Sequence, residues 1–190
     1  MIKLIISDFD GTLVDTFEAN YLAYKTAFEK VGHTLDRQNY NRFFGFRFER
    51  FMQEAGITDR EEIKQIRALK GEYYPDFFNK LKVNSPLLTM IRAFRKSGGK
   101  TAIASTARRK NLENALTHIN AVDDFDLILA GEDVSEGKPS PEIYLTVLQK
   151  TGIKAEEALV FEDSEVGIQA AKAAGINYIK INETFFHNGD

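Results

Sequence analysis

The sequence predicts an α/β fold in which five strands form a parallel sheet and an all-helical segment is inserted after the first strand. Five short apolar, β-rich runs predict the strands: residues 2–7, 101–105, 127–130, 158–161 and 177–181. Segments with helical periodicity separate the last four runs from one another. Strands that alternate with helices of this length are typical of a Rossmann-like sheet covered by helices on both faces.

The helices of this Rossmann-like core are predicted from residues that favour helix ends. Ser85 and Pro86 suit an N-cap and a first helical position, and Gly98 suits the end of the same helix. Ser140 and Pro141 repeat that starting pattern further along the chain. Helices are therefore expected near residues 85–98, 112–119, 140–152 and 164–175.

A long segment, residues 16–84, separates the first two predicted strands and contains no convincing strand of its own. Residues 17–31 carry aromatic and apolar side chains at spacings of four and three, which predicts an amphipathic helix. Thr58 and Glu61 form a possible capping box for a later helix, which Pro75 should kink or end. The expected division is an α/β core of residues 1–15 and 85–190 and a helical insert of residues 16–84.

The composition excludes several classes of protein. The 190 residues are 43% hydrophobic and 28% charged, which is typical of a globular domain. The absence of cysteine excludes a disulfide framework, a thiolate zinc site and a cysteine nucleophile. A net charge of −3 argues against nucleic acid, and neither a membrane span nor a signal peptide is found. We therefore expect a cytoplasmic enzyme of small-molecule metabolism.

Polar side chains that can do chemistry follow four of the predicted strands. In open parallel sheets, ligands bind where the carboxyl ends of the strands meet a crevice. The loops at that edge carry carboxylates, hydroxyls and one lysine, namely Asp8 and Asp10, Ser105 and Thr106, Lys138, and Glu162 and Asp163. The convergence of four loops is more informative than any one of these residues alone.

Four carboxylates near one point require a compensating cation. Asp8 and Asp10 are two residues apart on a chain that leaves a strand, so their side chains should leave on the same side. With Glu162 and Asp163 nearby, one carboxyl must protonate or a cation must enter. Oxygen ligands favour Mg²⁺, which would recruit a phosphate group that Lys138 could also bind. The Ser105 hydroxyl, and backbone N–H groups of a helix starting just after Thr106, would supply further donors to the phosphate.

The chain resembles the haloacid dehalogenase superfamily of aspartate-nucleophile phosphotransferases over nearly its whole length. Four motifs carry the resemblance in the order and at the spacings of the family: DFDGTLVDT from Asp8, Ser105 after an apolar strand, GKPSPEIY around Lys138, and FEDS from Phe161. The sequences around Lys138 and Asp163 are most similar to the branch with β-phosphoglucomutase and phosphoglycolate-phosphatase-like enzymes. The helical insert resembles the small cap domain of this family.

The resemblance implies a role for each matching residue. Asp8 would be the nucleophile, and Asp10 would be the general acid and base. The family also implies that Mg²⁺ is held by Asp8, the main-chain carbonyl of Asp10, Asp163 and Glu162. It implies that the phosphate is bound by Ser105, the Thr106 amide and Lys138. From the cap, the substrate would be contacted by Arg47 and Lys70. The implied partner is a small phosphorylated metabolite, and a monomer is favoured.

One departure from the family bears on the reaction. The related mutase has a histidine at the position of Asn20, and that histidine helps to control the proton on the acid/base aspartate. Asparagine cannot carry that proton, so the sequence favours a Mg²⁺-dependent phosphatase acting through an aspartyl-phosphate on a sugar-phosphate-like substrate. Two alternatives stay open: a phosphomutase of the β-phosphoglucomutase type, and a non-catalytic protein that binds a phosphorylated metabolite.

Overall fold

The computed structural model describes residues 1–44, 48–182 and 186, and the chain folds into two compact units. The first unit comprises Met1–Asp15 and Lys82–Asp190, and the second comprises Thr16–Leu81. Within the described residues, no helix has both the length and the hydropathy needed to cross a membrane.

The first unit contains a five-stranded sheet in the order β5–β4–β1–β6–β7, and every neighbouring pair of strands is parallel. The predicted α/β class and parallel sheet are confirmed. Because β1 lies between β4 and β6, the segments that follow β1 and β6 leave the sheet next to each other. The strands are β1 (Leu4–Ser7), β4 (Lys100–Ala104), β5 (Leu127–Leu129), β6 (Ala158–Glu162) and β7 (Asn177–Lys180).

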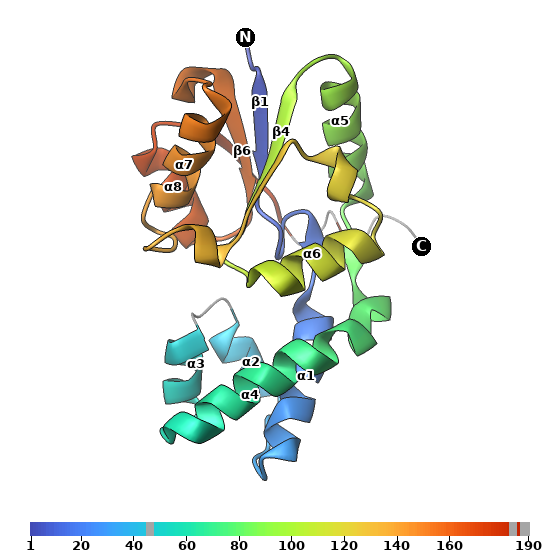
Figure 1. Ribbon diagram of the computed structural model, residues 1–190, viewed down its shortest axis with the longest axis vertical. Helices are drawn as coiled ribbons and strands as arrows, with labels where there is room; N and C mark the ends of the chain where they lie inside the picture. Colours follow the sequence, from blue (N-terminus) through green and yellow to red (C-terminus); the bar gives the residue numbers. More distant parts are fainter. Residues whose placement is uncertain (45–47, 183–185, 187–190) are drawn as a thin grey trace. The chain divides into compact units, whose positions relative to one another are not determined.

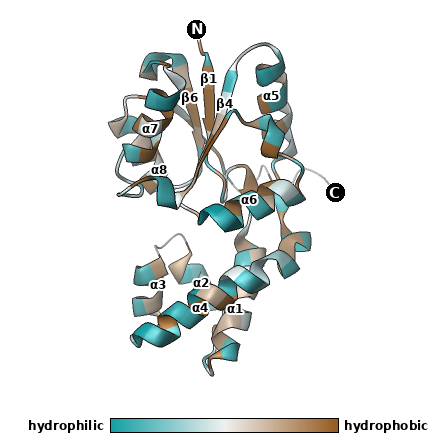
Figure 2. Ribbon diagram, viewed as in Figure 1, coloured by the Kyte–Doolittle hydropathy of each residue, from teal (hydrophilic) through white to brown (hydrophobic). Residues whose placement is uncertain are grey.

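Helices cover both faces of this sheet. In Figure 1, α7 and α8 lie on one side of the sheet and α5 lies on the other. All four residues of β1 are buried and three are apolar, as expected for a strand covered on both faces. Figure 2 shows β1 and β6 in the hydrophobic colour, whereas the surrounding helices include hydrophilic stretches. The helices of this unit are α5 (Ser85–Lys96), α6 (Arg109–His118), α7 (Glu142–Thr151) and α8 (Glu165–Ala173), with 3₁₀ segments η2 (Val122–Asp124), η3 (Gly131–Asp133) and η4 (Ala155–Glu157).

The N-cap of α5 is Asn84 and not Ser85, as the sequence had suggested. The Asn84 side-chain oxygen accepts a hydrogen bond from Leu87 N at 3.1 Å, and its amide nitrogen donates to Thr12 O at 3.2 Å. Asn84 is fully buried, whereas Ser85 is exposed. The Ser-Pro pattern favoured Ser85, but the contact with Thr12, 72 residues earlier, is one that local sequence cannot reveal.

Two short strands are present where no strand was predicted, one directly before and one directly after the second unit in the sequence. β2 (Val14–Asp15) and β3 (Lys82–Val83) pair in an antiparallel ribbon. Strands of two residues are too short to show an alternating pattern, and their partners are distant in sequence. The expectation of no strand within residues 16–84 was therefore wrong for β3, and β2 lies just before that segment.

The second unit is helical and has an aromatic core. Its buried cluster includes Tyr21, Phe28, Tyr40 and Phe51, whose rings contact one another. The helix that was expected to begin with a capping box at Thr58 is instead capped by Asp59, which accepts from two backbone N–H groups. The elements are α1 (Phe17–Lys30), α2 (Arg37–Phe43), α3 (Phe48–Glu54), α4 (Arg60–Tyr73), which ends before Pro75 as predicted, and the 3₁₀ segment η1 (Tyr74–Lys80).

Replacing Asn84 tests the buried cap of α5. We expect Asn84→Ala to lower the free energy of unfolding by about 2 kcal/mol, because it removes an N-cap acceptor and a buried donor. The matched control, Ser85→Ala, should change it by less than about 0.5 kcal/mol, because Ser85 is exposed. Urea unfolding of both variants measures the difference. Equal effects, or a larger effect at Ser85, would contradict the assigned cap.

Candidate active site

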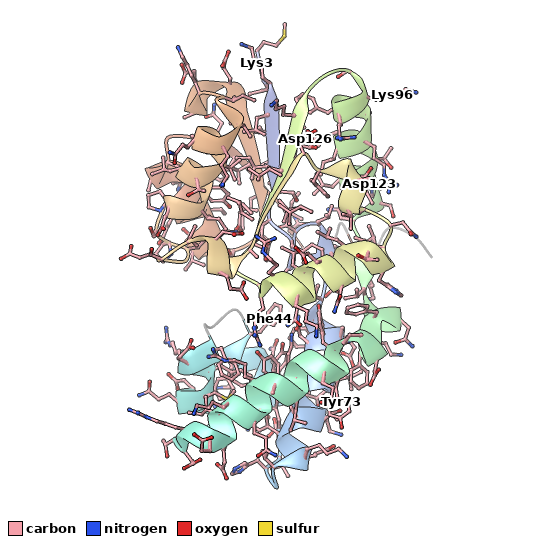
Figure 3. All side chains as sticks on the ribbon, in the orientation of Figure 1. Lys3, Phe44, Tyr73, Lys96, Asp123 and Asp126 are labelled. Atoms are coloured by element: carbon pink, nitrogen blue, oxygen red, sulfur yellow. The ribbon has the colours of Figure 1, made fainter. Side chains whose placement is uncertain are left out.

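The candidate site lies at the carboxyl ends of β1 and β6. Lys3, labelled in Figure 3, is at the opposite end of β1. Asp8 directly follows β1, and its backbone N–H donates to Phe161 O at 3.0 Å, which continues the pairing with β6. At Gly11 the backbone has a φ of +86°, and Gly11 N donates to Val14 O. The chain therefore turns sharply after the strand and leaves the Asp8 carboxylate at the edge of the sheet.

Three carboxylates meet at this edge. One oxygen from each of Asp8, Glu162 and Asp163 lies within 4.8 Å of the others. Asp8 and Glu162 are buried, and Asp163 is partly buried. Among the described residues, the Asp10 carboxylate is not a member of this cluster. The structure thus brings together three of the four carboxylates that the sequence placed near one point.

Lys138 is the cation of this cluster. Its Nζ donates to Asp8 Oδ1 at 2.6 Å and to Glu162 Oε1 at 2.5 Å, and its side chain is only 4% exposed. Burial alone would lower the pKa of Lys138, but its interactions with Asp8, Tyr144 and Glu162 together hold the pKa well above its ordinary value. Lys138 therefore stays charged and fixes the orientation of the Asp8 carboxylate.

Glu162 has hydrogen-bond donors on both of its carboxylate oxygens. Besides Lys138, Oε1 accepts from the Tyr144 hydroxyl at 3.3 Å. Oε2 accepts from both the N–H and the hydroxyl of Ser164, each at 2.9 Å. A Cβ on Gly167 would lie 1.7 Å from Oε1, so this position of α8 leaves room for the carboxylate. The Glu162 side chain is consequently held in one place.

Asp163 is positioned by the loop after β1. Its Oδ1 accepts from the Thr12 hydroxyl at 2.7 Å. A Cβ on Gly11 would lie 2.4 Å from Oδ2, so the glycine also makes room for this carboxylate. Burial raises the pKa of Asp163 to about 6, and the nearby charge of Glu162 acts in the same direction.

The chemistry of these three carboxylates fits a divalent cation. Burial raises the pKa of Asp8 well above its ordinary value. Lys138 opposes this shift, and the charges of Glu162 and Asp163 act in the same direction as burial. Three carboxylates and one lysine sum to a charge of −2 when all are ionised. A cluster of buried oxygen ligands with that charge could hold a divalent metal ion, which would remove the repulsion.

The loop after β4 carries the predicted phosphate ligands Ser105 and Thr106. Ser105 is buried, and its hydroxyl oxygen accepts from Ala107 N at 3.0 Å, which leaves its proton for another acceptor. Thr106 is exposed. The helix expected just after Thr106 begins only at Arg109, whose N–H donates to Glu132 Oε2. The N–H groups of Ala107 and Arg109 are thus already engaged within the protein.

The two predicted cap residues belong to the second unit. Lys70, in α4, is buried, and its Nζ lies 3.8 Å from the ring centroid of Tyr74 and 5.4 Å from that of Tyr24. Arg47 lies outside the described residues. A substrate contact by either residue stays a prediction.

Sequence reasoning assigned no role to three residues that build this site. Thr12, Tyr144 and Gly167 all lie within or just after the recognised motifs, and they contact Asp163 or Glu162. Their places in the motifs were the available signal. Their partners could not be deduced, because each contact joins residues that the fold brings together.

Comparison with known proteins identifies the family. The sequence pattern of haloacid dehalogenase-like hydrolases matches residues 5–181, so the chain belongs to this family. A relative described as putative phosphatase YhcW of Bacillus subtilis strain 168 is 33% identical over 185 residues, which cover 94% of this chain and 83% of the relative. A phosphorylated carbohydrates phosphatase of Thermotoga maritima is 32% identical over 182 residues, which cover 93% and 83%, respectively.

The fold is also shared with solved structures. The crystal structure of CbbY from Rhodobacter sphaeroides in complex with phosphate superposes with a TM-score of 0.87 at 28% identity, covering all of this chain and 90% of that chain. The predicted membership of the haloacid dehalogenase superfamily and the predicted hydrolase class are confirmed.

The raised pKa of Asp163 makes metal binding depend on pH. Since a metal ion needs the ionised carboxylate, protons compete with it below a pH of about 6. We expect the affinity for a divalent cation, measured with Mg²⁺ by titration calorimetry, to fall as the pH is lowered through about 6, by at least about tenfold for each pH unit below it.

Two variants set the controls for this titration. Asp163→Asn should abolish Mg²⁺ binding, and Glu165→Gln, an exposed carboxylate two residues away, should leave it unchanged. An affinity that does not vary between pH 5 and pH 8, or that survives in Asp163→Asn, would contradict the metal site.

Proposed function

We propose that the chain is a Mg²⁺-dependent phosphatase that hydrolyses a small, sugar-phosphate-like metabolite through an aspartyl-phosphate on Asp8. The observation that carries the proposal is the buried pairing of the Asp8 carboxylate with Lys138 Nζ at 2.6 Å, beside Glu162 and Asp163. A carboxylate that is fixed in this way at the edge of the sheet is oriented for attack on a bound phosphate ester.

The proposed reaction has two steps. In the first, an Asp8 carboxylate oxygen attacks phosphorus, the P–O ester bond breaks, and Asp10 gives its proton to the leaving alcohol oxygen. In the second, water gives a proton to Asp10 and attacks the same phosphorus. The Asp8–phosphate bond then breaks, which releases inorganic phosphate and restores both aspartates.

The remaining residues bind the phosphoryl group and balance its charge. The phosphoryl oxygens are bound by Lys138, the Ser105 hydroxyl and the Thr106 N–H while negative charge shifts among these oxygens. Mg²⁺, held by Asp8, the Asp10 carbonyl, Asp163 and Glu162, would offset the repulsion between the nucleophile and a phosphate dianion. The positive charge of Lys138 also reduces this repulsion, and the low dielectric constant of its buried surroundings strengthens that effect.

The substrate class is supported by the relatives. The Thermotoga maritima relative is named as a phosphatase of phosphorylated carbohydrates, and the CbbY structure contains phosphate. Both relatives align over nearly the whole of this chain, so a phosphorylated carbohydrate or a similar metabolite is the substrate class that we propose.

Asn20 favours hydrolysis over phosphoryl transfer to a second sugar hydroxyl. A mutase must keep its aspartyl-phosphate from water while its intermediate reorients, which requires control of the proton on the acid/base aspartate. The Asn20 side chain can hydrogen-bond but cannot take up that proton. Water should therefore be the main acceptor of the phosphoryl group.

Asp8→Asn tests the nucleophile. The amide is nearly isosteric but cannot form the phospho-enzyme, so hydrolysis of p-nitrophenyl phosphate with Mg²⁺ should be abolished. The metal-free variant should also melt at a higher temperature than the unaltered protein at pH 7, because it lacks a buried carboxylate whose pKa is raised. Asp123→Asn, an exposed control in η2, should retain activity. Substantial hydrolysis by pure Asp8→Asn protein would refute the assignment.

The ratio in which the phosphoryl group is transferred to water and to a sugar hydroxyl tests whether the enzyme is a phosphatase or a mutase. With β-glucose 1-phosphate, Mg²⁺ and a trace of the bisphosphate, we expect any phosphate that is released to exceed the glucose 6-phosphate formed. The two products are followed together, since a difference of about 1.4 kcal/mol between the barriers shifts their ratio tenfold. Faster formation of glucose 6-phosphate would favour the mutase.

A further inference from the structure

One aromatic side chain contacts both members of the buried Lys138–Glu162 pair. Tyr144, in α7, is fully buried, and its hydroxyl donates to Glu162 Oε1 at 3.3 Å. Lys138 Nζ lies 5.2 Å from the centroid of the Tyr144 ring, which is within the range of a cation–π contact. The same Oε1 atom also accepts from Lys138.

The hydroxyl of Tyr144 is not explained by packing. Its side chain belongs to an apolar cluster with residues such as Leu4, Ile143 and Val160, where a phenylalanine would fill nearly the same volume. A buried phenol costs free energy unless it is hydrogen-bonded, and here its acceptor is Glu162.

Glu162 is the link between Tyr144 and the lysine. The two Ser164 donors hold Oε2, and the missing side chain of Gly167 makes space for the carboxylate. With Oε2 held, the Tyr144 hydroxyl is a second donor to Oε1, besides Lys138. Lys138 binds that same oxygen at 2.5 Å, so the position of its ammonium follows that of Oε1.

We propose that Tyr144 is a positioning residue for the phosphate-binding lysine: its hydroxyl orients Glu162 Oε1, and its ring lies beside the Lys138 ammonium. The inference rests on the proposed function, because it requires Lys138 to bind the phosphoryl group. Tyr144 touches neither the substrate nor the reacting atoms. Its influence on the reaction passes through Glu162 and Lys138.

Tyr144→Phe removes the hydroxyl and keeps the ring. In the presence of Mg²⁺, we expect the variant to bind inorganic phosphate about threefold to tenfold more weakly, which is within the range for the loss of one ordinary hydrogen bond. Its melting temperature should change little. Phosphorus NMR titrations reach the millimolar dissociation constants that such a comparison needs. Tyr178→Phe, a partly buried tyrosine of β7 that packs against the same core cluster, is the matched control and should bind phosphate normally.

A double-mutant cycle separates positioning from packing. If Tyr144 acts through the lysine, Tyr144→Phe should change the phosphate dissociation constant by less than about twofold in a Lys138→Ala background. An equal loss in both backgrounds, with or without a lower melting temperature, would assign Tyr144 a packing role and overturn the proposal.

The outcomes also separate this inference from the proposed function. Absence of phosphate binding by the unaltered chain with Mg²⁺ would overturn the proposed function and the inference together. Normal phosphate binding by the unaltered chain and by Tyr144→Phe alike would overturn the inference alone.

Discussion

Three carboxylates meet at one edge of the sheet, where a buried lysine pairs with two of them, and the architecture of the site depends on holding them there. Like charges within 4.8 Å of one another repel strongly when they are removed from water. The parallel sheet creates this crowding, because β1 and β6 are neighbours and each is followed by acidic residues. Lys138 offsets only part of the negative charge, so the site is suited to a cation and then to a phosphate.

The surrounding residues support this arrangement in specific ways. Gly11 and Gly167 leave space that a Cβ would take from Asp163 and Glu162. Thr12 and Tyr144 each donate a hydroxyl hydrogen bond to one of the same two carboxylates. These residues stabilise a group of charges that would otherwise destabilise the folded state. Such preorganisation would let the site bind the phosphoryl group of the proposed reaction without first rearranging its own side chains.

Much of the fold could be predicted from the sequence, because strands alternating with helices leave few possible topologies. The location of the site at one edge of the sheet was predicted, because loops that follow parallel strands meet there. What could not be predicted depends on contacts between distant segments. Asn84 replaces Ser85 as a cap because it also reaches Thr12, and β2 pairs with β3 across the whole insert. Likewise, the Asp10 carboxylate is outside the cluster of three, although it is two residues from Asp8.

The most direct test of this account is the chemical identity of the phosphorylated residue. The enzyme is mixed with p-nitrophenyl phosphate and Mg²⁺, quenched with acid before one turnover is complete, and reduced with borohydride, which converts an aspartyl-phosphate to homoserine. Peptide mapping by mass spectrometry then locates the change. The account predicts homoserine at position 8 alone. An unmodified Asp8 during active turnover, or reduction at a different carboxylate, would contradict it.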